Sequence, residues 1–286
     1  MHNVYRRKKI FSIKVDLHTH TNFSDGILYP ESLVTFAFNR GVTLLSITDH
    51  DCLDAIPLAE KEARKLGISF VSGVELNTDF RGGEIHILGY CFNLENEFFQ
   101  EKLKQQREYR RLRLQAMLEK LRGIGFDLDA NRVHEIAGNG SVGRPHLALA
   151  LIEKGYVATV EEAFEKYLGY GKPGWVPRSK FTPQDAIQTI LQAGGIPVLA
   201  HPGRAGSFSL EELVAWGLKG LEVFYPMHAQ DYIEILLAEA KRYNLIVTAG
   251  SDYHGINPQE KGPGCVEMPE EFARRLQEIL VKSPKN

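Results

Sequence analysis

The sequence contains little that would cross-link the chain outside the cell or hold it in a membrane. Its three cysteines, Cys52, Cys91 and Cys265, are scattered and form no CxxC pair, so disulfide stapling is not expected. No stretch approaches the roughly 18 consecutive apolar residues of a membrane span. The basic start, Met1 to Lys9, is not followed by an apolar run of signal-peptide length. We therefore expect a cytoplasmic protein with no membrane partner.

The charge balance gives no sign of a strong polyanion binder. The 34 Lys and Arg residues are matched by 36 Asp and Glu residues, for a net charge of -2. Bulk electrostatics therefore does not draw the chain onto nucleic acid, and any anionic substrate must be attracted locally, by metal ions or a basic patch. The sequence also shows no Ser or Cys constellation for a protein nucleophile, and no obligate protein partner is evident.

Short apolar segments alternate with amphipathic ones along most of the chain. The apolar segments are rich in Ile, Val, Leu and Phe, which is typical of parallel strands buried on both faces. Strand–helix alternation of this kind predicts an α/β fold, either a parallel barrel or a doubly wound sheet. The expected strands are Ile13–Leu17, Leu44–Ile47, Ile68–Val74, Ile85–Gly89, Ile196–Ala200, Leu221–Phe224 and Leu245–Ala249.

The alternation breaks between about Glu95 and Phe181, where the sequence is almost wholly helical in pattern. A long charged segment from Glu101 to Arg122 is followed by the helix-ending Gly123 and Gly125. We expect a helical subdomain at residues 95–181, inserted into a barrel that is built from residues 1–94 and 182–286.

The strongest chemical signal is Asp16-Leu17-His18-Thr19-His20, directly after the first expected strand. Residues i and i+2 of an extended chain point the same way. His18 and His20 are therefore expected to bind one ion together. A single HxH motif is weak support by itself.

Histidines and carboxylates recur within or just past the carboxyl ends of the other expected strands. In parallel α/β folds this is where active sites lie. The coincidence over six of seven strands is hard to produce with structural histidines. The expected metal ligands are His18, His20, Asp25, His50, Glu75, His86, His201, Asp252 and His254.

Six imidazoles and three carboxylates exceed the three protein ligands of a typical catalytic zinc site. So many ligands imply two or three ions, with Glu75 and Asp252 as candidate bridges. Mixed ligation suits Mn²⁺, Fe²⁺ or Zn²⁺ better than Mg²⁺, and Mn²⁺ is our first expectation. Asp16 and Asp49 are expected to orient ligand imidazoles.

These motifs, in this order and on both sides of the insertion, resemble the polymerase-and-histidinol-phosphatase (PHP) superfamily of trinuclear phosphoesterases. The resemblance implies a distorted (β/α)₇ barrel and three divalent ions. In the implied assignment, His18, His20, Glu75 and Asp252 hold the first ion, Glu75, His86 and His201 the second, and Asp25, His50 and His254 the third.

The long insertion and its Ser141-Val142-Gly143-Arg144-Pro145-His146 stretch are similar to one PHP branch. That branch acts on nucleoside 3′,5′-bisphosphates and on the 5′ ends of short RNA. The similarity implies that Arg144 and His146 face the substrate phosphate, with catalytic or binding roles. Arg204 and His228 are further candidates for substrate binding at the mouth of the site.

The implied activity is hydrolysis of phosphate esters of nucleotides, such as pAp, or of 5′-phosphorylated short RNA, with release of phosphate. A bridging hydroxide acidified by two ions would attack phosphorus in line with the leaving oxygen. Arg144 would clamp a phosphate in a forked geometry. His146 or a metal-bound water would supply the proton to the leaving group.

The insertion is expected to set the substrate class. It leaves the chain after the fourth strand, whose carboxyl end is expected to face the metals, and would therefore fold over the mouth of the site.

Three alternatives remain open. A small-molecule phosphomonoesterase of the histidinol-phosphatase type would share the site and differ in its pocket. An amidohydrolase also begins with HxH but usually adds a bridging lysine, where this chain places Glu75. A non-catalytic, metal-stabilised module usually loses ligands, whereas this chain keeps all nine.

Overall fold

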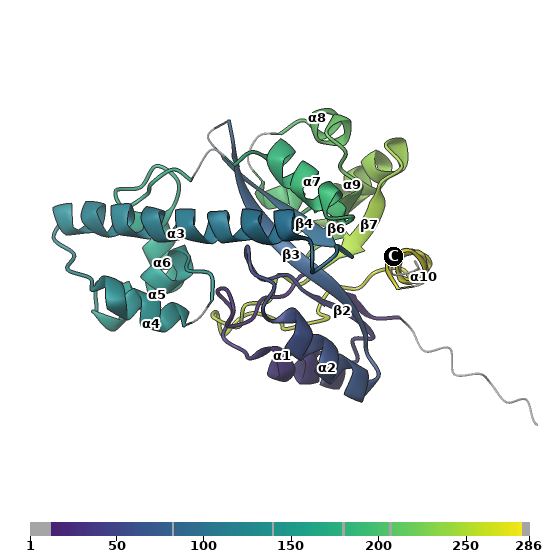
Figure 1. Ribbon diagram of the computed structural model, residues 1–286, viewed down its shortest axis with the longest axis horizontal. Helices are drawn as coiled ribbons and strands as arrows, with labels where there is room; N and C mark the ends of the chain where they lie inside the picture. Colours follow the sequence, from purple (N-terminus) through teal and green to yellow (C-terminus); the bar gives the residue numbers. More distant parts are fainter. Residues whose placement is uncertain (1–12, 82, 139, 179–180, 206–207, 282–286) are drawn as a thin grey trace, which may run out of the picture.

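The computed structural model describes residues 13–81, 83–138, 140–178, 181–205 and 208–281. Its centre is a single seven-stranded sheet whose strands follow one another in chain order (Figure 1). The strands are β1 (Val15–Asp16), β2 (Leu44–Ile47), β3 (Ser69–Phe80), β4 (Gly83–Tyr90), β5 (Ile196–Leu199), β6 (Gly220–Phe224) and β7 (Ile246–Ala249).

Backbone hydrogen bonds bring the first and last strands of the sheet together. Leu17 N donates to Ala249 O at 2.9 Å, and Asp252 N donates to His18 O at 2.8 Å. Thr19 and Tyr253 form an isolated parallel bridge just beyond. The sheet is therefore a nearly closed barrel, and the expected distorted (β/α)₇ architecture is confirmed.

The expectation that all seven strands run parallel is wrong for β4. This strand pairs antiparallel with both β3 and β5, whereas the four other pairings are parallel. The chain between Phe80 and Gly83 is too short for a crossover, so β3 and β4 must form a hairpin. As a result β4 ends at Tyr90, opposite Ile196, the first residue of β5. The carboxyl end of β4 thus lies where the parallel strands begin.

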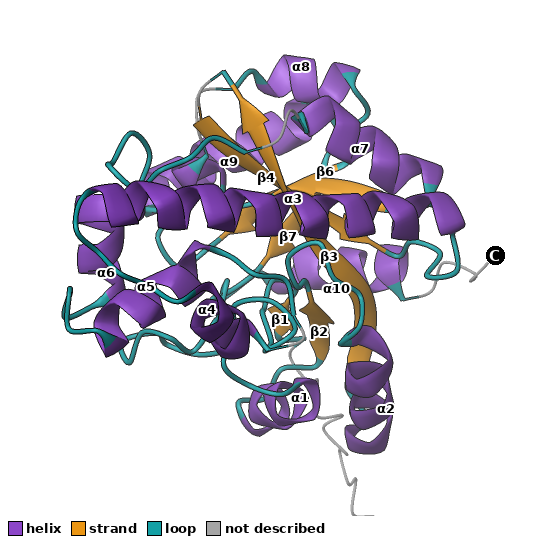
Figure 2. Cartoon of the chain, turned by 60° about the vertical axis from the view of Figure 1, so that its left-hand side comes forward, coloured by secondary structure: helices purple, strands orange, loops and turns teal. Residues whose placement is uncertain are grey.

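The path of the helical insertion follows from this reversal. Its first helix, α3 (Glu97–Gly123), starts at the barrel end opposite the expected ligands, so the expected exit point was wrong. The helix has 27 residues, or about 40 Å at 1.5 Å per residue. That length carries the chain back along the barrel to the ligand-bearing rim, where Arg110 binds Asp51. Figure 2 shows α3 crossing the sheet toward α5 and α6.

The two halves of α3 belong to different hydrophobic cores. Phe99 and Leu103 pack into the barrel core, whereas Leu114 and Leu121 pack into a separate cluster. That second cluster is completed by the rest of the insertion, which comprises α4 (Ala130–Ala137), α5 (Arg144–Glu153), α6 (Val160–Ala163) and a π-helical turn, η1 (Phe164–Leu168).

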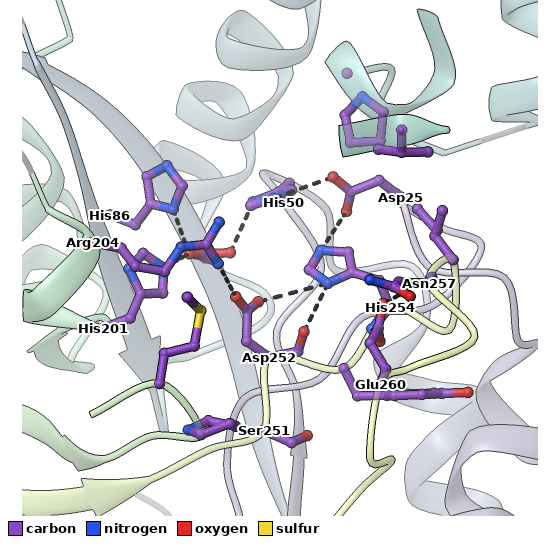
Figure 3. Close-up of a pocket in the computed structure, with 18 of the residues that line it drawn as sticks. Asp25, His50, His86, His201, Arg204, Ser251, Asp252, His254, Asn257 and Glu260 are labelled. Carbon is purple, nitrogen blue, oxygen red and sulfur yellow. Dashed lines mark hydrogen bonds and ion pairs between the residues drawn. The ribbon is translucent and has the colours of Figure 1, made fainter. Parts of the chain in front are cut away.

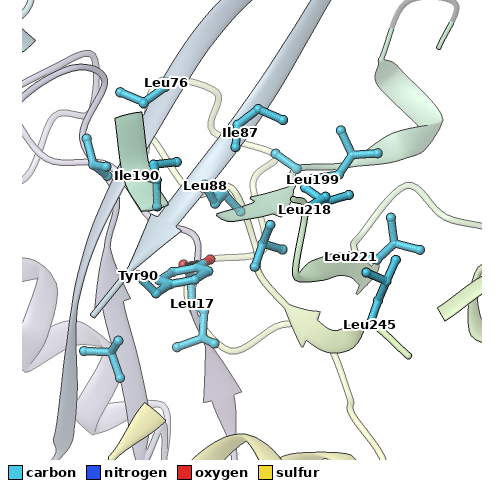
Figure 4. Close-up of a cluster of buried hydrophobic side chains, with 14 of the residues drawn as sticks. Leu17, Leu76, Ile87, Leu88, Tyr90, Ile190, Leu199, Leu218, Leu221 and Leu245 are labelled. Atoms are coloured by element: carbon cyan, nitrogen blue, oxygen red, sulfur yellow. Dashed lines mark hydrogen bonds between the residues drawn. The ribbon is translucent and has the colours of Figure 1, made fainter. Parts of the chain in front are cut away.

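The barrel core packs helices against the strands. Figure 4 shows Tyr90 among buried leucines and isoleucines, and its hydroxyl donates to Leu17 O at 2.8 Å. Among the described residues, no helix is long and apolar enough to cross a membrane. The remaining helices are α1 (Pro30–Asn39), α2 (Ile56–Leu66), α7 (Pro183–Gln192), η2 (Pro202–Arg204), α8 (Leu210–Ala215), α9 (Gln230–Arg242) and α10 (Glu270–Leu280).

Candidate metal centre

All nine predicted ligands lie together at the rim where the parallel strands end. Thr19, between His18 and His20, turns its hydroxyl to Ser46 O at 2.8 Å, which leaves the two imidazoles on the other side. His86 reaches the same rim although its strand is reversed. The donor groups fall into three clusters: His18, His20, Glu75 and Asp252; Glu75, His86 and His201; and His20, Asp25, His50 and His254.

The first cluster has the dimensions of a tetrahedral metal site. Its donors are the Nε2 atoms of His18 and His20 and one oxygen each of Glu75 and Asp252. The four nitrogen-to-oxygen separations are 3.4, 3.3, 3.3 and 3.3 Å. A tetrahedral site with metal–ligand distances of about 2.0–2.1 Å requires donor separations of about 3.3–3.4 Å. The spacing of these side chains therefore fits a bound divalent ion.

Glu75 connects the first cluster to the second. Its Oε2 faces His18 and His20, while its Oε1 lies 2.8 Å from His86 Nδ1 and 3.3 Å from His201 Nε2. The two oxygens of one buried carboxylate thus contact two different groups of imidazoles. This arrangement matches the predicted bridging role of Glu75.

The third cluster is built around Asp25, whose two oxygens divide between two rings. Oδ2 lies 3.4 Å from His50 Nε2, and Oδ1 lies 3.4 Å from His254 Nε2, as Figure 3 shows. His20 stacks on His254 with ring centroids 4.1 Å apart. Its Nδ1 lies 3.8 Å from Asp25 Oδ1, so His20 stands between the first and third clusters.

Several buried nitrogen and oxygen atoms that could bind metal ions have no hydrogen-bond partner among the described residues. A buried polar atom without a partner is costly, and native proteins rarely leave one unexplained. Here five such atoms gather in one place and are the types that bind metal ions. They are the Nε2 atoms of His18 and His20, Nδ1 of His50, Oδ1 of Asp25 and Oε2 of Glu75.

Asp252 is arranged to bind one ion and not to bridge two. Its Oδ1 faces His18 and His20. Its Oδ2 accepts hydrogen bonds from the Tyr225 hydroxyl at 3.1 Å and from Arg204 Nη1 at 3.1 Å. The suggestion that Asp252 is a second bridge is not supported by this geometry.

Glu222, which we did not predict, supports ligands of two clusters. His18 Nδ1 lies 3.1 and 3.2 Å from its two oxygens, and His201 N donates to Glu222 Oε2 at 2.7 Å. The contact with Nδ1 leaves Nε2 of His18 available to an ion. The sequence signal was a single acidic residue inside the apolar run Gly220-Leu221-Glu222-Val223-Phe224.

The two carboxylates that we expected to orient imidazoles act differently. Asp49 accepts from Thr21 N at 2.8 Å and from Ser24 Oγ at 2.6 Å, and Ser24 Oγ lies 3.4 Å from His20 Nδ1. Asp16 instead accepts from the backbone amides of Ser251 and Gly264, at 2.9 and 2.6 Å. The prediction was therefore wrong for Asp16, which holds ligand-bearing loops by their backbone and contacts no ring.

Three of the six described non-glycine residues with positive φ lie at or beside ligands. His201 and Asp252 have positive φ angles of 27° and 54°, and Asp51, next to His50, has a φ of 53°. Non-glycine residues in this region each cost on the order of 1–3 kcal/mol and persist only where their surroundings fix them. The hydrogen bonds of Glu222 and Asp16 hold the backbone at two of these loops.

The buried charges of the centre balance one another in the absence of metal. Burial raises the pKa of Glu75, but His50, His86 and His18 outweigh burial and hold it well below its usual value. For His254 the effects have the opposite sign: burial lowers its pKa, but Asp25 and Asp252 outweigh burial and raise the pKa to about 10. The pKa values of His18, His20 and His86 are raised as well, so these rings and His254 hold protons that bound ions would have to displace.

A cavity of about 760 Å³ opens above the centre. Arg144 lines it, with Nη2 2.5 Å from Glu84 Oε2. Arg204 lines it beside Asp252 (Figure 3). The volume is within the usual range for small-molecule sites, so two of the four predicted substrate-binding residues lie where a substrate would reach them.

The other two predicted residues are not among those that line the cavity. His146 Nδ1 accepts from Gly143 N at 2.9 Å at the start of α5, and its ring also bonds to the backbone of Ser24. The Nδ1 of His228 donates to Val223 O at 2.8 Å, and its Nε2 accepts from Gly203 N at 3.3 Å. Substrate contact by His146 and His228 stays a prediction that this arrangement does not favour.

A comparison with protein-family models finds a match to the PHP domain over residues 16–170. The chain belongs to the PHP domain family. Its seven-stranded barrel, its ligand clusters and its insertion are therefore those of a PHP protein.

Known PHP relatives match almost the whole chain. The 5′-3′ exoribonuclease Rnm of Salmonella typhimurium is 36% identical, over 85% of this chain and 86% of the relative. The 3′,5′-nucleoside bisphosphate phosphatase of Chromobacterium violaceum is 34% identical, over 87% and 89%. A solved structure from Bifidobacterium adolescentis, described as a metal-dependent phosphoesterase, has a TM-score of 0.83 and 28% identity, over 92% and 94%. This PHP chain is accordingly a metal-dependent phosphoesterase, a hydrolase of phosphate esters.

Replacing Glu222 by Gln should weaken the binding of divalent ions about 10- to 100-fold, the usual cost of losing a partner of a ligand imidazole. The amide nitrogen of Gln cannot accept from His201 N, and the neutral side chain supports His18 less well. Ion affinity can be measured by competition with a coloured chelator. Wild-type affinity in folded Glu222→Gln protein would contradict this role. Glu211→Gln, an exposed change on α8, is the matched control.

Ion binding should tighten as pH rises from about 6 to 9, because ligand protons must leave. The pKa values of His18, His20, His86 and His254 are all raised in the metal-free protein. Below those pKa values, protons on the ring nitrogens compete with the ion. Above them, the ring nitrogens are free to bind the ion. Calorimetric titrations in two buffers with different ionisation enthalpies would count the released protons. A pH-independent affinity with no proton release would contradict the prediction.

Proposed function

We propose that the centre holds three divalent ions, with Mn²⁺ as first choice, and hydrolyses phosphate esters of nucleotides. The favoured substrates are nucleoside 3′,5′-bisphosphates such as pAp and short 5′-phosphorylated RNA. The observation that carries the proposal is the arrangement of nine donor residues, six buried and three half-buried, in three clusters linked by Glu75 and His20. The names of the Salmonella and Chromobacterium relatives support the substrate class.

The residues of the centre provide what phosphoryl hydrolysis needs. Bound divalent ions would acidify a water molecule and neutralise phosphoryl oxygens. Glu75 holds neighbouring ligand groups at a fixed separation through its two oxygens. Arg204 and Tyr225 place hydrogen-bond donors beside Asp252, with Arg204 Nη1 2.8 Å from the Tyr225 hydroxyl. A phosphoryl oxygen at the centre would lie within reach of these donors.

The cavity wall beside His86 is strongly basic, with Arg144 and Arg178 among its lining residues. Arg113, Arg144 and Arg178 all lie within 3.5 Å of the Glu84 carboxylate. Burial, together with neighbouring Arg178 and Arg144, lowers the pKa of Arg113 to about 9. One carboxylate does not neutralise three guanidinium groups. A chain with a net charge of -2 thus has a local positive surface for an anionic substrate.

Metal analysis and a substrate panel test the proposal together. Fully loaded, active protein should contain about three ions per chain. It should cleave pAp or 5′-phosphorylated oligoribonucleotides faster than AMP, p-nitrophenyl phosphate or histidinol phosphate. The reason is that a metal centre contacts only the phosphoryl group. The preference for one phosphate ester over another must therefore come from the basic wall and the insertion. One ion per active chain would exclude the trinuclear centre, and a preference for histidinol phosphate would exclude the nucleotide assignment.

Changing Arg144 to Ala should lower kcat/KM for pAp about 10- to 150-fold, because a hydrogen bond between charged groups is worth roughly 1.5–3 kcal/mol. Activity toward p-nitrophenyl phosphate should change much less. Arg144→Lys should rescue only in part, since lysine lacks the guanidinium fork. Arg111→Ala, an exposed change on α3, is the control. Equal losses for both substrates would mean that Arg144 acts on the fold and not on a second phosphate.

A further inference from the structure

The helix α3 carries a charged residue in the middle of its apolar face. Its buried positions recur at helical spacing through Phe99, Leu103, Gln106, Arg110 and Leu114. Arg110 is 7% exposed, whereas the side chain of its neighbour Arg111 is 66% exposed. Arginine is almost never fully buried unless it is paired. The position of Arg110 therefore requires an explanation from its partners.

The partner of Arg110 on the barrel is the residue directly after a ligand. Arg110 Nε donates to Asp51 Oδ2 at 2.6 Å, and Asp51 follows His50 in the chain. One turn earlier on α3, Arg107 Nη1 donates to Asp51 O at 3.0 Å. Two arginines of the insertion thus bind both the side chain and the backbone carbonyl of one barrel residue.

Asp51 needs such support because its backbone is strained. Its φ of 53° lies in the left-handed region, which costs a non-glycine residue free energy unless the surroundings fix it. On the barrel side, Asp51 N donates to Glu75 O at 3.1 Å. The turn after His50 is therefore clamped between β3 on one side and α3 on the other.

Arg110 has a second attachment on β3. Its Nη2 donates to Asn77 Oδ1. Asn77 lies two residues after Glu75 on the same strand, so the two side chains share a face. Asn77 is also the cross-strand neighbour of His86. One guanidinium group thus contacts residues that adjoin the ligands His50, Glu75 and His86.

We propose that Arg110 is a positioning residue of the metal centre, so that the helical insertion is a working part of the centre and not only a cover over it. The inference rests on the proposed metal centre. A salt bridge that merely tied the insertion to the barrel would serve equally well anywhere along α3. This one is placed where the helix passes the rim, and its planar fork spans two ligand-bearing segments at once. It holds both segments at a fixed separation.

The test compares variants of the full chain at three positions. Arg110→Met removes the fork and the charge, and Arg110→Lys keeps the charge but cannot span both segments. Asp51→Asn weakens the same link from the barrel side. Arg111→Met, one residue along the same helix and exposed, is the matched control. Each protein is first checked for folding by circular dichroism, then titrated with Mn²⁺ against a competing chelator, and with Co²⁺ by visible absorption.

We expect the folded Arg110 variants to bind Mn²⁺ about 10- to 100-fold more weakly than wild type. Their Co²⁺ spectra should change in shape, which a loss of stability alone would not cause. Arg111→Met should match wild type in both measurements. In the double variant with Asp51→Asn, the losses should be less than additive, because both changes break one link. If Arg110→Met does not fold, the Mn²⁺ affinity and the Co²⁺ spectrum of Arg110→Lys provide the test.

The outcomes separate the inference from the function on which it rests. A wild-type protein that binds no divalent ion would overturn both. Wild-type protein that binds ions, with folded Arg110 variants that bind them equally tightly and give the same Co²⁺ spectrum, would overturn the inference alone.

Discussion

The Glu75 carboxylate is the group on which the arrangement of this molecule depends. It is almost fully buried and stands within 3.4 Å of ring nitrogens from His18, His20, His50, His86 and His201. Burying a carboxylate is costly unless it is paired, and here the pairing comes from five side chains on four separate chain segments. The barrel is what brings those segments to one point. Its near closure is therefore a condition for the centre and not a separate property of the fold.

Two further buried carboxylates, Glu222 and Asp16, support the ligands from behind. Glu222 fixes a ring of one cluster and a backbone amide of another. Asp16 joins the loops after β1 and β7 through the backbone amides of His18, Ser251 and Gly264. Because the loops at His201 and Asp252 are strained, the ligands cannot be held by local preference alone. They are held by buried charges that contact strands distant in the sequence. Removal of a residue that contacts no ion would therefore still weaken ion binding at the centre.

The sequence predicted what depends on local pattern. Seven apolar runs located all seven strands, and the ligands stood out because His and acidic residues recur at their ends. The reversal of β4 was missed because apolar composition carries no information on direction. The Arg81-Gly82-Gly83 sequence between two apolar runs was the available signal for a hairpin. The roles of Glu222 and Asn77 depend on which strands become neighbours, which no spacing within one strand specifies. His146 was placed at the substrate by resemblance, whereas its ring bonds at the start of α5.

The reversal of β4 also changes how the insertion relates to the chemistry. Had β4 run parallel, the insertion would have left the chain at the rim and formed a lid with no need to cross the barrel. Because β4 ends at the opposite edge, α3 must run the length of the barrel to return, and half of it packs into the barrel core. The helix then passes the rim with Arg107 and Arg110 against Asp51 before it reaches the insertion's own core. In the roles proposed above, substrate recognition by Arg144 on α5 and positioning of the metal centre by Arg110 on α3 both belong to the insertion. Under those two proposals, a change in the insertion that alters specificity should also affect ion binding at the centre unless it spares this part of α3.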